Sequence, residues 1–290
     1  MADSPRIVIA GDVIDDIVVV PHAPIRPDTD TASTIASRAG GSPANTAAWL
    51  GSIGGSVDFV GLVGSADVER HSALLAAHGV RAHLAPHPSA RTGTIVVIVD
   101  GELRAMLTER GANADFDPDA VPDSLLQGAS ALFLTGHSLA GRTEASAMRR
   151  LVSRARVAGL DVAVAPGSAG HIADIGVETF LTAFEGATVL LASLDEGRAL
   201  SGVVEVAEVA EHLTRFAETV VLTLGGEGSF VAGHGVVAAV AAEVVDPTGA
   251  GDAFAAGFLD AWVVNRDAAA AAAAGAALAA RAVTVVGGRP

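Results

Sequence analysis

The chain has 290 residues, half of them hydrophobic, which is enough for one large α/β domain or two small ones. Its formal net charge of −15 disfavours binding to nucleic acid and to anionic membranes, so we expect neither as a partner. Cysteine is absent, which excludes disulfides and thiolate chemistry, and all 18 basic residues are arginine. Without lysine, phosphate binding must use backbone amides, helix ends, arginine or metal.

Short β-branched segments alternate with alanine- and leucine-rich helical patterns along the chain. The predicted strands are residues 6–11, 56–64, 129–136, 161–166, 187–193 and 219–226. The predicted helices include residues 42–54 (with Ser42 as the cap and Pro43 in the first turn), 68–80, 143–159 and the alanine-rich segment 268–286. Apolar strands that alternate with helices predict a parallel sheet covered on both faces, with ligands at the carboxyl ends of the strands.

Two segments depart from this alternation. Residues 15–37 have extended character, three prolines and no helical period. Residues 91–113 predict a β-hairpin with its turn at residues 100–102. Because no helical crossover separates these strands, we expect a small β flap beside the main sheet. Exposed edge strands need a partner, so the flap predicts a homodimer.

The stretch DPTGAGDAFAAGF, residues 246–258, combines a glycine-rich turn with the start of a helix. Its apolar residues recur at helical spacing, so the helix should begin near Gly251 or Asp252. Small residues at positions 249–251 leave backbone N–H groups uncovered at the positive end of the helix, which predicts an anion site. Asp252 is then either a helix N-cap or an acid with a role beside a bound phosphate.

DPTGAGDAF resembles the second signature of the ribokinase-like, phosphofructokinase B-type carbohydrate kinases. Residues 40–69 resemble the first signature of that family, and residues 11–16, 111–113 and 222–229 match further motifs in the same order. The resemblance implies an α/β fold, a three-layer sandwich with a mostly parallel central sheet and a small β-sheet lid. It implies one domain over residues 1–290, with the lid formed by about 13–38 and 91–110.

By this resemblance, Asp252 is the catalytic base that accepts a proton from the attacking sugar hydroxyl. The amides of Gly249, Ala250, Gly251 and Asp252 would form an anion hole for the transferred γ-phosphoryl group of ATP. The residues expected to bind the sugar are Asp12, Asp16, Gly40, Gly41 and Asn45. Asn45 could instead be a helix-surface residue.

The resemblance also assigns the nucleotide and metal sites. The residues expected along the phosphates and ribose of ATP are Thr223, Gly225, Gly226 and Gly228. Glu196 is expected to act on Mg²⁺ through water, although Ser193 replaces the asparagine usual in the family. Asp246 and Thr248 match positions that hold a monovalent cation such as K⁺, but Asp246 could be only a turn residue before Pro247.

Together these features predict a cytoplasmic, ATP-dependent kinase that phosphorylates a hydroxymethyl group of a small sugar. The start of the chain lacks the basic residues and longer apolar run of a signal peptide. Ribose or fructose is favoured as the substrate, and a nucleoside is the alternative. An acidic sugar is disfavoured because residues 104–113 lack the aromatic-plus-arginine segment that is expected of ketodeoxygluconate kinases. A non-catalytic regulator that binds a sugar or nucleotide is the alternative of another class.

Overall fold

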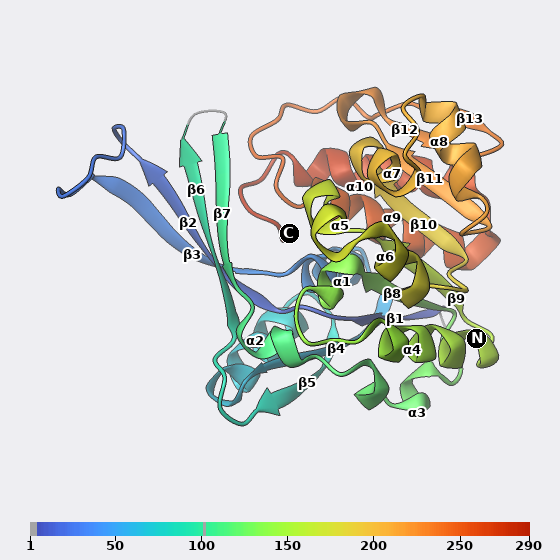
Figure 1. The fold of residues 1–290 in the computed structure, drawn as a ribbon, viewed down its shortest axis with the longest axis horizontal. Coiled ribbons are helices and arrows are strands. Elements are labelled where there is room, and N and C mark those ends of the chain that lie inside the picture. Colours follow the sequence, from blue (N-terminus) through green and yellow to red (C-terminus); the bar gives the residue numbers. More distant parts are fainter. Residues whose placement is uncertain (1–4, 101–102) are drawn as a thin grey trace.

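The main sheet of the protein has nine strands, in the order β13-β12-β11-β10-β9-β8-β1-β4-β5 (Figure 1). It is seen in a computed structural model that describes residues 5–100 and 103–290. The strands are β1 (Arg6–Ala10), β4 (Ser56–Gly64), β5 (Arg81–His87), β8 (Ala131–Thr135), β9 (Asp161–Ala165), β10 (Val189–Ser193), β11 (Thr219–Thr223), β12 (Ser229–Val231) and β13 (Gly235–Val237). From β11 to β5 all neighbours pair in parallel, and β12 and β13 add an antiparallel edge. The predicted parallel sheet is confirmed.

Helices cover both faces of this sheet, and alternate residues of the strands face one or the other layer. In β1, Ile7 and Ile9 join one buried cluster while Val8 and Ala10 join the other. The first layer contains α1 (Ser42–Ser52), α2 (Val68–Ala76), α9 (Ala250–Asn265) and α10 (Ala268–Ala282). The second contains α3 (Asp123–Leu126), α4 (Ala145–Val157), α5 (Ala169–Ile175), α6 (Val177–Ala183), α7 (Leu194–Ser201) and α8 (Val206–Leu213). Short 3-10 turns occur at η1 (Ser65–Asp67), η2 (Gly111–Asp115), η3 (Pro118–Ala120), η4 (Gly136–Leu139) and η5 (Gly225–Glu227).

A second sheet of four strands, in the order β3-β2-β6-β7, projects from the main body (Figure 1). Its strands are β2 (Ile14–Pro21), β3 (Ser33–Gly40), β6 (Gly93–Asp100) and β7 (Leu103–Glu109). The antiparallel pairing of β6 with β7 confirms the predicted hairpin, whose turn includes residues 101–102 that lie outside the described residues. We call this four-stranded sheet the lid.

The alanine-rich segment forms a helix that packs closely on α9, as predicted. A Cβ atom added to Gly257 would lie 2.7 Å from the Ala274 carbonyl oxygen, and one added to Gly275 would lie 2.8 Å from that of Phe254. Small residues therefore let the two helix backbones approach each other, which fixes α9 and the glycine turn at its start. No helix in the described part of the chain is long and apolar enough to cross a membrane.

Candidate active site

Asp252 lies in the first turn of α9, which begins at Ala250 after the N-cap residue Gly249. Its carboxylate does not cap the helix. Instead, Oδ1 accepts a 2.6 Å hydrogen bond from Ser42 Oγ and Oδ2 accepts one of 3.0 Å from Asn45 Nδ2. The interpretation of Asp252 as an N-cap is therefore wrong. Ser42 is not a cap either, because Gly41 holds that position in α1 and the Ser42 hydroxyl is directed to Asp252.

The surroundings of Asp252 set its protonation. Burial raises its pKa to about 6, while hydrogen bonds from Ser42 and Asn45 and the charge of Arg289 oppose that rise. A carboxyl group with this pKa is mostly ionised at neutral pH and still basic enough to accept a proton. The site therefore holds a partly buried carboxylate that is suited to general-base chemistry.

The turn before α9 exposes the helix N-terminus beside this carboxylate. Gly249 has φ of 78°, and a Cβ on it would lie 2.6 Å from Gly288 Cα, so the position requires glycine. Gly251 and Asp252 sit in the first helical turn, where no carbonyl four residues back accepts their N–H groups. The Ala250 amide contacts the Pro247 carbonyl at a long 3.3 Å. This helix end can hold an anion next to the carboxylate.

A cavity of about 520 Å³ opens on the other side of this helix end. All four residues predicted to bind the nucleotide line it, together with two residues of the α9 start: Thr223, Gly225, Gly226, Gly228, Ala250 and Gly251. The remaining wall was not predicted residue by residue and comes from residues 239–242, Val244, Pro247, Phe254, Ala276, Ala279, Ala280 and Val283. The helical spacing of residues 276, 279, 280 and 283 could have indicated one face at the end of α10, but alanine carries no chemical signal for a ligand.

The expected sugar-binding residues largely converge on Asp252. Asn45 bonds to it directly, and the Asp16 carboxylate lies so close to Gly40 that a Cβ there would be 2.1 Å from Asp16 Oδ2. Burial raises the pKa of Asp16 to about 6, and the charge of Arg289 opposes this rise. Gly41 caps α1 with φ of 91° and packs against the Asp12 backbone. The carboxylates of Asp16 and Asp252, the Asn45 amide and the glycine backbone thus surround the position expected for the sugar.

Asp12 is positioned by an arginine that the sequence did not reveal. Arg110 Nη2 donates 2.6 Å hydrogen bonds to Asp12 Oδ2 and to the His137 carbonyl. Asp12 is buried, and its Oδ1 has no hydrogen-bond partner among the described residues. Asn113, in the motif at residues 111–113, holds the Val13 backbone through both amide atoms at 3.0 and 2.7 Å. That motif therefore supports the base of β2.

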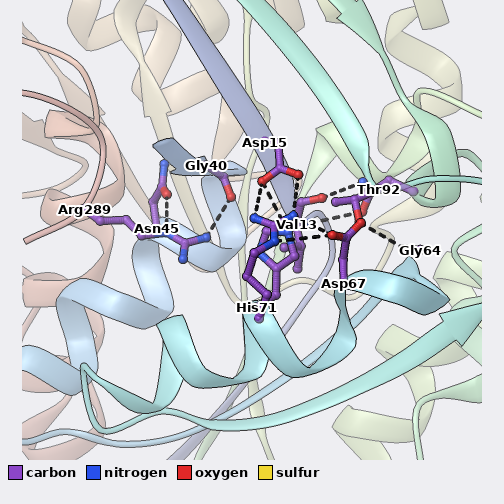
Figure 2. Close-up of polar contacts among 11 residues, drawn as sticks. Val13, Asp15, Gly40, Asn45, Gly64, Asp67, His71, Thr92 and Arg289 are labelled. Carbon is purple, nitrogen blue, oxygen red and sulfur yellow. Dashed lines mark hydrogen bonds and ion pairs between the residues drawn. The ribbon is translucent and has the colours of Figure 1, made fainter. Parts of the chain in front are cut away.

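Arg289, which follows α10, is the second unpredicted residue of the site (Figure 2). Its Nε donates a 3.0 Å hydrogen bond to Asn45 Oδ1, and its Nη2 donates one of 2.8 Å to the Gly40 carbonyl. The backbone of the same segment is held by Trp49 Nε1, which donates to Gly288 O at 2.9 Å. Burial lowers the pKa of Arg289 to about 10, so the group stays charged at neutral pH. Because 244 residues separate Arg289 from Asn45, no local pattern could have indicated this contact.

The residues predicted for metals have clear local partners. Ser193 and Glu196 form a capping box at the start of α7: Ser193 N donates to Glu196 Oε2 at 2.7 Å, and Glu196 N donates to Ser193 Oγ at 3.2 Å. Asp246 accepts hydrogen bonds from Thr248 Oγ1 at 2.6 Å and from Gly287 N at 3.0 Å. Within the described residues, no three acidic, histidine or cysteine side chains cluster as a metal site.

The lid is joined to the main body by a charged cluster beside the site (Figure 2). Asp15 on β2 accepts hydrogen bonds of 2.8 and 2.7 Å from Arg70 on α2, and Asp67 accepts one of 2.8 Å from the same guanidinium. His71 Nε2 lies 3.4 Å from Asp15 at ion-pair distance but outside hydrogen-bond geometry. Thr92 Oγ1 at the base of β6 donates to Asp67 at 2.7 Å. Asp15 and Asp16 are consecutive residues of one strand, so their side chains point to opposite faces of the lid. Asp15 anchors the lid through Arg70, and Asp16 faces the site beside Gly40.

Known proteins resemble the chain along its whole length. Residues 4–290 match the pfkB family carbohydrate kinase. An ATP-dependent ribose-1-phosphate kinase from Halopiger xanaduensis is 29% identical over 276 residues, covering 90% of this chain and 86% of the relative. The structure of adenosine kinase from Sinorhizobium meliloti superposes with a TM-score of 0.87 at 25% identity, over 100% of this chain and 96% of the other.

A further likeness concerns the fold. Ribokinase from Arabidopsis thaliana, solved with ribose and ATP, superposes with a TM-score of 0.79 at 24% identity, over 98% of this chain and 94% of the other. The nine-stranded sheet, its two helical layers and the lid are thus those of the ribokinase fold. The chain belongs to the pfkB family of carbohydrate kinases and is a phosphotransferase with an alcohol group as acceptor.

Proposed function

We propose that the protein transfers the γ-phosphoryl group of ATP to a hydroxymethyl group of a small sugar, with ribose or fructose as the leading neutral candidates. Asp252 accepts the hydroxyl proton, and the amides of residues 249–252 hold the phosphoryl oxygens. The observation that carries this proposal is the partly buried Asp252 carboxylate, bonded to Ser42 and Asn45, at a helix N-terminus that also borders the cavity.

The two functions of this helix end involve different atoms. The carboxylate of Asp252 faces the side chains of α1, where the sugar hydroxyl would attack. Gly251 lines the cavity on the nucleotide side. Phosphoryl transfer depends on positioning and charge stabilisation, both of which a fixed helix N-terminus supplies. Acid and anion therefore act together, because the hydroxyl lies between the carboxylate and the phosphorus atom.

Two cations complete the proposal. Mg²⁺ would neutralise charge on the ATP phosphates, and Glu196 would bind its water shell. The segment with Asp246 and Thr248 would hold K⁺ close to the anion hole. Because Asp246 also accepts a hydrogen bond from Gly287 N, this loop is connected to the C-terminal segment that contains Arg289.

Nucleosides and a sugar phosphate join the candidate substrates. The likeness to an adenosine kinase favours a nucleoside as the second candidate, and the curated relative is named for ribose 1-phosphate. A regulator without catalysis is the third possibility, and the intact acid and glycine turn speak against it.

The outer face of the lid supports a homodimer. Strand alternation and register place a row of apolar residues on the face opposite Asp16, and two of them, Ile35 and Leu107, are 64% and 60% exposed. The residues on this face are Ile17, Val19, Ile35, Val96, Ile98 and Leu107. Exposed apolar surface on a sheet with open edges favours pairing of two lids. Sedimentation should show a dimer that Ile35→Asp dissociates, and a wild-type monomer would refute this part of the proposal.

ADP release with ATP and Mg²⁺, measured over a panel of ribose, fructose, ribose 1-phosphate and adenosine, tests the proposed activity. We expect one acceptor to raise ADP release well above the rate with ATP alone. Product mass should show one added phosphoryl group. A protein that binds these compounds without turnover would instead be a regulator.

A further inference from the structure

The guanidinium of Arg289 is held beside Asp252 but is only partly satisfied. Nε and Nη2 donate to Asn45 Oδ1 and to Gly40 O, which hold the planar group against two of the residues expected to bind the sugar (Figure 2). The third nitrogen, Nη1, is buried and has no hydrogen-bond partner among the described residues. A buried charged donor without a partner is costly, so this nitrogen calls for an acceptor that a ligand would bring.

Two other arginines near the site are neutralised by carboxylates. Arg70 pairs with Asp15, and Arg110 pairs with Asp12 at 2.6 Å. Over residues 5–100 and 103–290, no carboxylate lies within ion-pair distance of Arg289. Its charge acts on Asp16 and Asp252 only through space. A residue whose sole role was to balance these carboxylates would contact one of them.

A second arginine approaches the same segment from the lid. A Cβ added to Gly287 would lie 3.2 Å from Arg38 Cδ, and one added to Gly288 would lie 2.5 Å from Asn45 Nδ2. The two glycines therefore run between the Arg38 side chain on β3 and the amide beside the base. Arg38 is exposed and, within the described part of the chain, has no carboxylate partner. It faces Asp16 across the β2–β3 pair.

We propose that the sugar substrate carries an anionic group, a phosphoryl or carboxylate, which binds Arg289 through Nη1 with Arg38 closing from the lid. A planar guanidinium matches the geometry of both anions. The Asn45 amide lies between Arg289 and Asp252, so the anionic group and the attacked hydroxymethyl group are at different positions on the sugar. This inference rests on the proposed function. It also revises the sequence-based expectation, because the arginine comes from residue 289 rather than from residues 104–113.

The test compares kcat/KM for ribose 1-phosphate, for the carboxylated sugar 2-keto-3-deoxygluconate, and for ribose and fructose. The variants are Arg289→Gln and Arg38→Gln, with the exposed Arg281→Gln on α10 as the matched control. Arg289 also orients Asn45, so its loss lowers the rate with every substrate. Only an anion-binding role changes the ratio of kcat/KM between an anionic and a neutral sugar.

We expect wild type to prefer one of the two anionic sugars. A preference for ribose 1-phosphate would identify the anionic group as phosphoryl, and a preference for 2-keto-3-deoxygluconate would identify it as carboxylate. Arg289→Gln should reduce the anionic-to-neutral ratio roughly 10- to 100-fold, Arg38→Gln should reduce it less, and Arg281→Gln should leave it unchanged. A wild-type preference for ribose or fructose, or an unchanged ratio in Arg289→Gln, overturns the inference and leaves the kinase proposal standing.

Binding without ATP separates the two proposals if no sugar is turned over. Calorimetry with ribose 1-phosphate and with 2-keto-3-deoxygluconate would then be run on wild type and Arg289→Gln. If wild type binds one of the two compounds and Arg289→Gln binds it at least tenfold more weakly, the inference is retained and the kinase proposal is refuted. Equal binding to both proteins, or no binding of either compound, overturns the inference.

Discussion

Removing the Ser42 hydroxyl should shift the pH dependence of the reaction. Ser42 Oγ donates a 2.6 Å hydrogen bond to Asp252 Oδ1 and stabilises the ionised carboxylate. Burial already raises the pKa of Asp252 to about 6 against this contribution. In Ser42→Ala, one of the opposing hydrogen bonds is lost while the burial stays, so the pKa should rise further.

The size of the shift follows from the strength of that bond. A hydrogen bond to a charged group contributes roughly 1.5–3 kcal/mol, and one pKa unit corresponds to about 1.36 kcal/mol, so the shift is roughly 1–2 units. The acid limb of kcat/KM should move from about 6 to between about 7 and 8. At pH 7 the rate should fall roughly 2- to 10-fold, and at pH 9 it should return to about the wild-type rate.

The assay is the initial rate of ADP release between about pH 5 and pH 9.5 with an active acceptor, in wild type and Ser42→Ala. Ser52→Ala is the matched control, because Ser52 lies on the same helix and its hydroxyl donates to the Trp49 carbonyl away from the site. An acid limb that does not move would refute the assignment of that limb to Asp252.

Three other substitutions test separate parts of the site. Gly249→Ala should destabilise the fold by at least about 1 kcal/mol in urea unfolding, because φ is 78° and the new Cβ would meet Gly288. Asp15→Asn should lower stability by about 1 kcal/mol at pH 7 through loss of the Arg70 pair. Burial raises the pKa of Asp15, but the His71 and Arg70 side chains outweigh it and hold the pKa well below its usual range. The stability difference should therefore begin to shrink as the pH falls below about 4 and disappear only at the lower pH where the native carboxylate is protonated. Asp246→Asn should abolish the stimulation of kcat by KCl over NaCl.

Each of these expectations has a contradicting result. Wild-type stability of Gly249→Ala would mean that the turn relaxes without strain. A stability difference in Asp15→Asn that does not shrink between about pH 4 and pH 2 would show that charge does not cause it. An unchanged response of Asp246→Asn to KCl would remove the proposed cation site.

The sequence predicted the elements whose pattern is local. Residues 246–258 indicated both the buried face of α9 and the open turn before it, because apolar spacing and small residues are visible within one segment. Six strands of the main sheet and the hairpin of the lid were confirmed for the same reason, whereas β5, β12 and β13 were not predicted. Thr223, Gly225, Gly226 and Gly228 line one cavity, and their binding of the nucleotide stays a prediction.

The contacts that complete the site depend on long-range packing. Arg110 reaches Asp12 across 98 residues, and Arg289 reaches Asn45 across 244, so neither could be read from spacing. Ser42 satisfied the rule for a helix cap, but Gly41 takes that position because a positive φ is needed there. The prediction for Glu196 on Mg²⁺ remains a prediction, since the capping box explains its place in α7 without a metal.

Sugar-dependent ADP release by Asp252→Asn tests the central claim most directly. Asparagine preserves the shape and the contact to Ser42 but cannot accept the hydroxyl proton. We expect kcat to fall roughly 10²- to 10⁴-fold, while calorimetry shows that ATP and the sugar still bind. A turnover rate within a few-fold of wild type would contradict the assignment of Asp252 as the base.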